Sequence, residues 1–207
     1  MENEHGRQAN DDEWGRKEMI MEKLWLASGS PRRAEILRAV GWPFEAIPMD
    51  VDEKLLAGES ALAMVERLAL DKAQAAARVC SQGLVLGADT TVVVDSEILA
   101  KPEDERDARR MLRLLSGRWH DVLTGVALVR AGNDSARIVA QEKTQVRFAA
   151  ISDEEIDWYI QSNEPMGKAG AYGVQGRASL FIEEIRGDYW NIVGLPVRLV
   201  YKLASQV

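Results

Sequence analysis

The chain has 207 residues, of which 46% are hydrophobic and 29% are charged, a composition typical of a globular protein and not of a disordered chain. Lys and Arg number 26 against 33 Asp and Glu, giving a formal net charge of −7, so we do not expect nucleic-acid binding through a broad basic face. A single cysteine, Cys80, excludes an intrachain disulfide and fits a reducing compartment. The sequence shows neither an apolar run of about 18 residues nor a secretory signal, so we expect a cytoplasmic protein without a membrane partner.

The N-terminal half begins with an acidic segment and then predicts a strand–turn–helix unit. Six acids stand against three bases in the first twenty residues, and we predict residues 1–22 to be a disordered acidic tail and residues 23–207 to be one domain. A strand at 24–27 leads into a turn, and Pro31 begins a helix that ends near Gly41. A helix over 61–80, a strand over 84–94, a turn and a return strand over 98–100 follow.

The C-terminal half continues the alternation of helices and strands. We predict a helix over 104–115, strands over 122–129 and 138–148 around a turn at Gly132-Asn133-Asp134, a helix opened by a capping box at Ser152–Glu155, a glycine-rich segment over 165–176, strands over 179–185 and 190–193, and a last helix from Pro196. Because no repeat period is present, the predicted fold is α/β, with a mixed twisted sheet and flanking helices.

The segment Ser28-Gly-Ser-Pro-Arg32-Arg33 is a candidate phosphate site. A helix start offers unpaired backbone amides, the glycine permits close approach of a ligand, and the Arg32 and Arg33 guanidinium groups suit phosphate oxygens. It is not a Walker A loop, because the Gly-x-x-x-x-Gly-Lys pattern is absent. An ordinary Ser-capped helix with solvated arginines is the alternative.

Asp89 and Lys72 are charged residues in apolar surroundings. Asp89 interrupts an apolar run, where an unpaired carboxylate costs several kcal/mol; the alternative is that the strand ends at Ala88. Lys72 falls on the apolar face of its helix, four residues from both Leu68 and Ala76. Lys72 could point into a cleft together with Lys101, or its stem could extend past apolar neighbours to water.

Two further segments are candidates for binding. The acids of Asp50-Val-Asp52-Glu53 could bind a hard divalent cation or belong to a solvated loop. The density of glycines from Gly167 to Gly176 indicates backbone packed against a ligand, with the Gln175 amide able to read a base edge, whereas a flexible linker is the alternative. His5 and His120 form no cluster with Cys80, so the sequence gives little support for zinc or a Ser-His-Asp triad.

Five motifs follow one another along the chain: Leu26-Ala-Ser-Gly-Ser-Pro-Arg-Arg33, Gly87-Ala-Asp-Thr90, Lys101-Pro102, Ser116-Gly117 and Lys168-Ala-Gly-Ala-Tyr-Gly-Val-Gln-Gly176. In this order they resemble the Maf family of nucleoside triphosphate pyrophosphatases. The resemblance runs from about Leu24 to the carboxyl end, and its last motif is similar to the branch that acts on dTTP and UTP. It implies two lobes around a deep cleft, often a homodimer, and cleavage between the α and β phosphates.

The resemblance also implies roles for individual residues. Asp89 would be the proton acceptor and would share a divalent cation, Mg²⁺ or Mn²⁺, with Glu53. The phosphates would be held by Ser28, Arg32, Lys72 and Lys101, and base preference would be set by Arg32, Thr90 and Gln175. The alternatives are a related pyrophosphatase that prefers CTP or 7-methyl-GTP, and a non-catalytic nucleotide-binding regulator of cell division.

Overall fold

The computed structural model describes residues 21–133 and 136–207. The predicted acidic tail therefore lies almost wholly outside the described residues, as does Asp134 of the predicted turn. The strands are β1 Leu24–Leu26, β2 Phe44–Ala46, β3 Leu84–Val94, β4 Glu97–Leu99, β5 Trp119–Arg130, β6 Arg137–Phe148 and β7 Ile182–Arg186. The α-helices are α1 Pro31–Ala39, α2 Ala61–Ala77, α3 Glu105–Leu115, α4 Asp153–Gln161, α5 Tyr189–Val193 and α6 Val197–Ala204.

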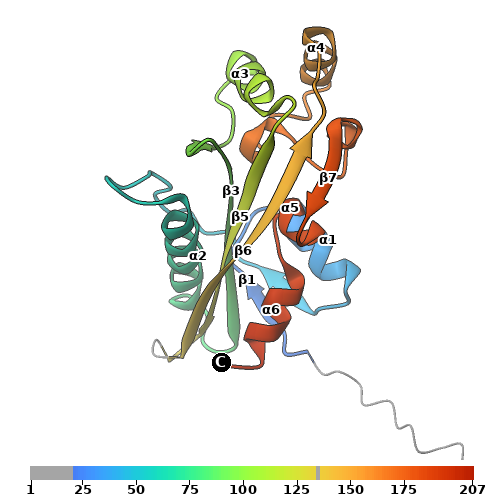
Figure 1. Cartoon of the computed structure of the whole chain (residues 1–207). Helices are drawn as coiled ribbons and strands as arrows, with labels where there is room; N and C mark the ends of the chain where they lie inside the picture. Colours follow the sequence, from blue (N-terminus) through green and yellow to red (C-terminus); the bar gives the residue numbers. More distant parts are fainter. Residues whose placement is uncertain (1–20, 134–135) are drawn as a thin grey trace, which may run out of the picture.

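A seven-stranded mixed sheet forms the centre of the fold (Figure 1). Its strands lie in the order β2-β1-β3-β5-β6-β7, and β4 pairs with the end of β3. β1 runs parallel to β2 and β3, whereas β3, β5, β6 and β7 are joined by antiparallel pairings. The predicted α/β class with a mixed sheet and flanking helices is confirmed.

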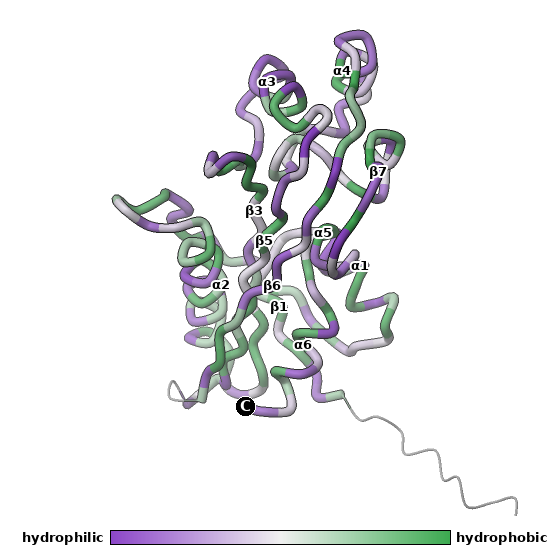
Figure 2. Tube along the Cα trace, viewed as in Figure 1, coloured by the Kyte–Doolittle hydropathy of each residue, from purple (hydrophilic) through white to green (hydrophobic). Residues whose placement is uncertain are grey.

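The two faces of the sheet are covered by different helices. Leu84 and Leu86 of β3 belong to the main apolar core, which also takes side chains from α1, α3, α4 and α6. Val85, between them, points to the opposite face and meets the alanines of α2, as the alternation of a strand requires. Figure 2 shows hydrophobic and hydrophilic residues mixed along α2, which buries one side on the sheet.

Two glycines allow α2 to lie directly on the sheet. A Cβ atom at Gly87 of β3 would stand 2.0 Å from the backbone oxygen of Ala69, and one at Gly125 of β5 would stand 2.1 Å from that of Val65. Both helix residues are fully buried. The close approach brings the middle of α2, where Lys72 is located, against the middle of β3.

The structure corrects the predicted elements at several places. Residues 190–193 are not a strand but belong to α5, because Asp188 caps the backbone N–H of Trp190 and Gly194, with φ of 123°, follows the helix. In the predicted strand over 179–185, residues up to Phe181 belong to the 3-10 helix Arg177–Phe181, and β7 begins at Ile182. The long helix ends at Ala77, three residues before Cys80. β2 was not predicted, since three residues are too short for a periodic signal.

No helix within the described ranges 21–133 and 136–207 is long and apolar enough to cross a lipid bilayer.

Candidate active site

A cleft of about 930 Å³ opens between two parts of the fold. One part contributes the β1–α1 turn and α2, and the other contributes β4 and residues 164–176, which lie toward the end of the sheet that carries α3 and α4 (Figure 1). The eight residues to which the resemblance assigns a role line this cleft, as does Arg33, whereas Asp50 and Asp52 of the acidic segment do not. The nine are Ser28, Arg32, Arg33, Glu53, Lys72, Asp89, Thr90, Lys101 and Gln175. Their catalytic and binding roles stay predictions.

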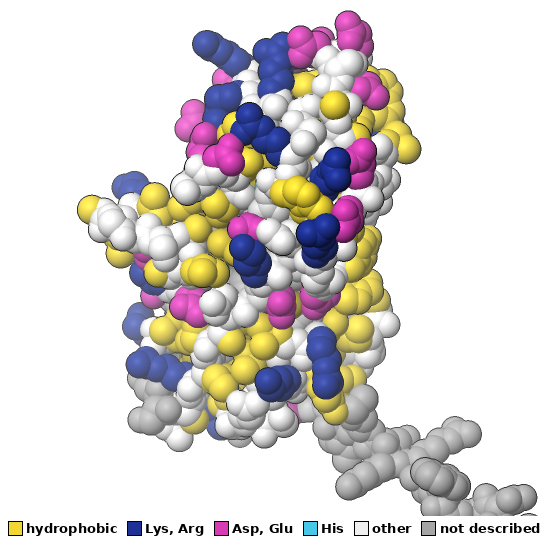
Figure 3. Space-filling view, in the orientation of Figure 1, with side chains coloured by type: hydrophobic (Ala, Val, Ile, Leu, Met, Phe, Trp, Pro, Cys, Tyr) yellow, Lys and Arg dark blue, Asp and Glu magenta, His cyan; other side chains and the backbone are white. Residues whose placement is uncertain are grey.

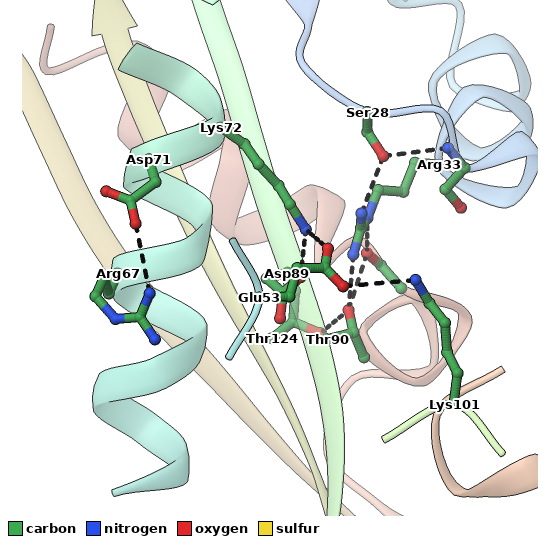
Figure 4. A network of polar contacts seen from close by, with 12 residues as sticks. Ser28, Arg33, Glu53, Arg67, Asp71, Lys72, Asp89, Thr90, Lys101 and Thr124 are labelled. Atoms are coloured by element: carbon green, nitrogen blue, oxygen red, sulfur yellow. Dashed lines mark hydrogen bonds and ion pairs between the residues drawn. The ribbon is translucent and has the colours of Figure 1, made fainter. Parts of the chain in front are cut away.

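Lys72 joins two carboxylates of the cleft, those of Asp89 and Glu53 (Figure 4). Its Nζ atom lies 2.6 Å from Asp89 Oδ1 and 2.6 Å from Glu53 Oε1. The side chains of Lys72 and Asp89 are only 9% and 13% exposed, so each charge depends on the other for compensation. Lys101 is 64% exposed and approaches the second oxygen of Glu53 at 3.7 Å.

The sheet register explains why Asp89 faces Lys72. Asp89 pairs across the strands with Gly125, which has no side chain to block the approach of α2. Asp89 also lies two residues from Gly87 and therefore on the same face of β3. The strand continues past this point to Val94, so the alternative that β3 ends at Ala88 is wrong.

Glu53 is the acid of its segment that reaches the cleft. Asp52 instead accepts a hydrogen bond from the backbone of Lys54, 3.1 Å away, and no group of three acids, histidines or cysteines able to hold a metal occurs among the described residues. Partial burial acts to raise the pKa of Glu53, but the hydrogen bond and charge of Lys72, together with the charge of Lys101, leave that pKa below its usual value.

The guanidinium group of Arg33 is hydrogen-bonded within the protein. It donates to Gly194 O at 2.8 Å, to Ser28 Oγ at 3.0 Å and to Thr90 Oγ1 at 3.1 Å. It thereby joins the β1–α1 turn, β3 and the end of α5. Burial lowers the pKa of Arg33, and the negative charge of Asp89 opposes that shift, while an arginine stays charged in either case.

Ser28 retains a hydroxyl proton for a ligand. Its Oγ atom accepts from Arg33 and from the backbone N–H of Ser30, at 3.0 and 3.2 Å. A hydroxyl that accepts twice still has one hydrogen to donate, and Ser28 lines the cleft. The geometry therefore leaves Ser28 as a donor to an acceptor such as a phosphate oxygen.

Arg32 and Gln175 have polar side-chain groups that no other described residue engages. Neither side chain makes a hydrogen bond or ion pair with the residues that the structure describes, and both line the cleft. Arg32 is half-buried, and Gln175 is exposed. A guanidinium and an amide without protein partners are available to bind a ligand.

Glu164 and Lys168 were missed by the sequence analysis, although both line the cleft. The Glu164 carboxylate accepts from the Tyr159 hydroxyl and from the backbone N–H of Arg177, each at 3.0 Å. A Cβ atom at Gly176 would meet this carboxylate at 2.2 Å. The glycine-rich segment is therefore folded around a half-buried acceptor. In the sequence, only Lys168, the first residue of the last motif, indicated that this region takes part in the site.

His120 contacts the glycine-rich segment through Tyr172. Its Nε2 atom lies 2.8 Å from the hydroxyl of Tyr172, a cleft-lining residue. Burial lowers the pKa of His120 to about 4, although the nearby charge of Asp121 opposes the shift. His120 is therefore neutral at pH 7, and its role is structural, as the hydrogen-bond partner of Tyr172.

The charges of the cleft contrast with those of the whole chain. Five basic side chains and three acidic ones line it, although the chain carries a net charge of −7. On the face seen in Figure 3, basic and acidic side chains are interspersed. An α/β fold whose cleft gathers five cations beside three carboxylates is typical of a protein that binds phosphorylated ligands.

The chain belongs to the Maf family: residues 23–207 match the family model described as "Maf-like protein". It is 53% identical over 186 residues to a protein of Symbiobacterium thermophilum named dTTP/UTP pyrophosphatase, covering 90% of this chain and 94% of the relative. A protein of the same name from Bacillus mycoides is 48% identical over 184 residues, covering 88% and 95%. A HAM1 protein from Coxiella burnetii shares the fold at 16% identity, with a TM-score of 0.52 over 90% of this chain and 100% of that chain.

Proposed function

We propose that this protein is a nucleoside triphosphate pyrophosphatase that acts on dTTP and UTP. It adds water across the anhydride bond between the α and β phosphates, which releases the nucleoside monophosphate and pyrophosphate. The observation that carries the proposal is the buried Asp89–Lys72 pair, joined to Glu53, at the centre of a cleft lined by five cations. High identity to two relatives named dTTP/UTP pyrophosphatase supports the choice of substrate.

In this proposal, Asp89 orients the attacking water and accepts its proton. Oδ1 is held by Lys72, which fixes the direction of the carboxylate and leaves Oδ2 for a water molecule. Because a carboxylate alone is a weak base for bulk water, whose pKa is about 15.7, the acceptor role depends on electrostatic help from the site. Phosphoryl chemistry relies mainly on positioning and charge neutralisation, which Ser28, Arg32, Lys72 and Lys101 are placed to provide.

Glu53 and Asp89 fit a divalent cation. Their oxygen atoms lie 2.6 Å from the same Lys72 nitrogen, so two hard ligands converge on one region, and Mg²⁺ commonly takes one or two carboxylates and completes its shell with phosphate oxygens and water. When bound, the cation supplies neutralisation of phosphate charge. We expect activity to be lost in a chelator and restored by Mg²⁺ or Mn²⁺, and full activity in the chelator would contradict this requirement.

A pyrophosphate-release assay tests the proposed substrates. The purified protein with Mg²⁺ or Mn²⁺ is given dTTP, UTP, CTP, dATP and 7-methyl-GTP in separate reactions. We expect dTTP and UTP to be hydrolysed far faster than the others. A preference for CTP or 7-methyl-GTP would assign the related pyrophosphatase, and absence of turnover on every nucleotide would favour a nucleotide-binding regulator.

An Asp89→Asn variant tests the proton acceptor. We expect kcat to fall by about 10² to 10⁴, while the protein stays folded because the amide is similar in shape and Glu53 still pairs with Lys72. Asp121→Asn is the matched control: Asp121 lies on the neighbouring strand β5 and also pairs with a lysine, Lys143, at 2.6 Å, but it is not among the residues lining the cleft. Equal activity in the two variants would rule out the assignment of Asp89.

The single cysteine, Cys80, is a free thiol, which supports a reducing compartment and hence the cytoplasm as the proposed location. A homodimer and the absence of nucleic-acid and membrane partners stay predictions.

A further inference from the structure

Two basic side chains of the cleft have no acidic partner and leave most of their hydrogen-bond donors unused. Arg32 and Lys168 both line the cleft, and neither forms an ion pair with a described residue. The other cations are compensated or internally bonded: Lys72 by Asp89 and Glu53, Lys101 by Glu53, and Arg33 by three acceptors. Arg32 and Lys168 therefore combine a positive charge that has no acidic partner with unused hydrogen-bond donors.

The Lys168 ammonium is held in place by the glycine-rich segment. Its Nζ atom donates to the backbone oxygen of Glu164, while its Cδ and Cε atoms fill the space beside Gly173, where a Cβ would stand 3.0 Å from each. An ammonium has three hydrogens, so two remain after this bond. The Glu164 carboxylate accepts from Tyr159 and the backbone of Arg177, and Lys168 contacts Glu164 only through its backbone oxygen.

Arg32 and Lys168 carry like charges in one cleft and repel each other. Burial and the positive charge of Arg32 lower the pKa of Lys168, with only partial opposition from Glu164. An anion that contacts both groups would remove this repulsion and would take the unused donors of each. Arranged in this way, a guanidinium and an ammonium are suited to phosphate oxygens.

We propose that Lys168 is a further substrate-binding residue, which grips the phosphate chain of the nucleotide together with Arg32. The proposal rests on the proposed function, because it names a contact for the same substrate. The phosphate chain is the partner because it is the only anionic part of a nucleoside triphosphate; the base and the sugar are uncharged. Lys168 thus ties the segment that carries Gln175 to the phosphates, so both ends of the nucleotide are held by one stretch of chain.

Binding, measured without turnover, tests this contact. Isothermal titration is carried out with dTTP and with inorganic tripolyphosphate on full-length Asp89→Asn protein that carries Lys168→Met, Lys168→Arg or neither. Methionine keeps the aliphatic stem that packs beside Gly173 and removes the charge. Lys202→Gln is the control for loss of a lysine away from the cleft, because Lys202 is an exposed residue of α6.

We expect Lys168→Met to raise the Kd for both ligands roughly tenfold or more, as loss of a charge-assisted hydrogen bond implies. Lys168→Arg should bind within about threefold of the parent, and Lys202→Gln should be unchanged. Tripolyphosphate lacks a base, so an effect on both ligands assigns the contact to the phosphates. An unchanged Kd for tripolyphosphate in Lys168→Met, or no binding of tripolyphosphate to the parent, would overturn the proposal.

Folding is checked by thermal unfolding of each variant. If Lys168→Met melts well below the parent, Lys168→Gln replaces it, and failure of both to fold while Lys168→Arg folds would show that the charge is structural, which also overturns the proposal. Because the titration needs no hydrolysis, a wild-type protein that does not hydrolyse dTTP or UTP would refute the proposed function and leave the Lys168 result interpretable.

Discussion

At the scale of single residues, the adjacent Arg32 and Arg33 show how burial assigns different tasks to identical side chains. Arg33 is 9% exposed and donates to acceptors on three separate segments. Arg32 is half-buried and makes no hydrogen bond within the described parts of the chain. The sequence predicted both as substrate ligands, since a pair of arginines after a helix start gives no indication of which one turns inward.

Replacing each arginine with lysine separates the two tasks. Arg33→Lys loses a planar fork that a single ammonium cannot reproduce, and we expect the free energy of unfolding to fall by about 2 to 3 kcal/mol. Arg32→Lys should leave stability within about 0.5 kcal/mol of wild type and raise KM for dTTP. Denaturant unfolding and steady-state kinetics of both variants check this. Equal stability of the two variants would contradict the internal role of Arg33.

His120 gives the protein a pH-dependent stability. Its pKa is lowered to about 4 in the folded chain, against about 6.5 when unfolded. Between these two values the unfolded state binds the proton and the folded state does not, so stability falls as the pH is lowered through that window. The free energy of unfolding is therefore about 2 kcal/mol lower at pH 5 than at pH 7, because a pKa difference of one unit corresponds to about 1.36 kcal/mol.

A His120→Gln variant measures this contribution. Its free energy of unfolding should be lower than that of wild type at pH 7, because the bond to Tyr172 is altered, but it should lose about 2 kcal/mol less than wild type between pH 7 and pH 5. Chemical denaturation of wild type and His120→Gln at pH 7 and pH 5 gives the four free energies of unfolding that are compared. A parallel decline of the two proteins would show that His120 titrates normally.

At the scale of elements, the contact between α2 and the sheet determines whether the site forms. Lys72 can reach Asp89 because Gly87 and Gly125 let the helix backbone touch the strands. The sequence predicted the helix, the strand and the unusual position of Lys72 on the apolar face. It could not predict the closeness of the contact, because a glycine in a strand has several explanations.

A methyl group at Gly87 should push α2 away from the sheet. Gly87→Ala would place its Cβ 2.0 Å from the oxygen of Ala69, so we expect a loss of about 3 kcal/mol in the free energy of unfolding and a large fall in kcat from separation of Lys72 and Asp89. Gly29→Ala is the control for stability, because its Cβ would meet Pro48 at an ordinary 3.6 Å. Unfolding by denaturant compares the two, and a Gly87→Ala protein as stable as wild type would refute the argument.

The elements also show where prediction from sequence stops. Long periodic segments such as α2, β3 and β6 were predicted near their observed bounds. The four residues 190–193 were predicted as a strand, since a short apolar run has no readable period. Their helix was indicated instead by Asp188 before them and Gly194 after them, the residue types favoured at the two ends of a helix.

At the scale of the whole molecule, the cleft is assembled from segments spread between Ala27 and Gly194. The sequence could name nine residues of the site, because each stands out in its own local context or belongs to a motif. It could not give the Lys72 bridge between two carboxylates, the internal bonds of Arg33 or the folding of residues 167–176 around Glu164. Those features depend on contacts between segments that are distant in the chain, for which local patterns carry no information.

The two ends of the described chain meet on β5, and this contact sets where the domain begins. Arg130 donates to both carboxylate oxygens of Glu22, at 2.9 and 3.1 Å, and to the backbone oxygen of Val207 at 2.9 Å. The Nε1 atom of Trp42, a buried residue, donates to the backbone oxygen of Glu22 at 2.9 Å. The segment that holds Glu22 is therefore part of the packed structure.

Truncation at two neighbouring positions tests this boundary. We propose that removal of residues 1–20 leaves the melting temperature and kcat/KM unchanged, because the family match begins at residue 23 and all cleft residues follow it. Removal of residues 1–23 should lower the melting temperature by about 4 to 8 °C, since an unpaired buried Trp42 N–H costs about 2 kcal/mol, while activity at 25 °C persists. Calorimetry and pyrophosphate release compare both proteins with the full chain. Loss of activity on removal of residues 1–20 would mean that these residues take part in function. Equal melting temperatures of the two truncated proteins would show that the contacts of Glu22 do not stabilise the fold.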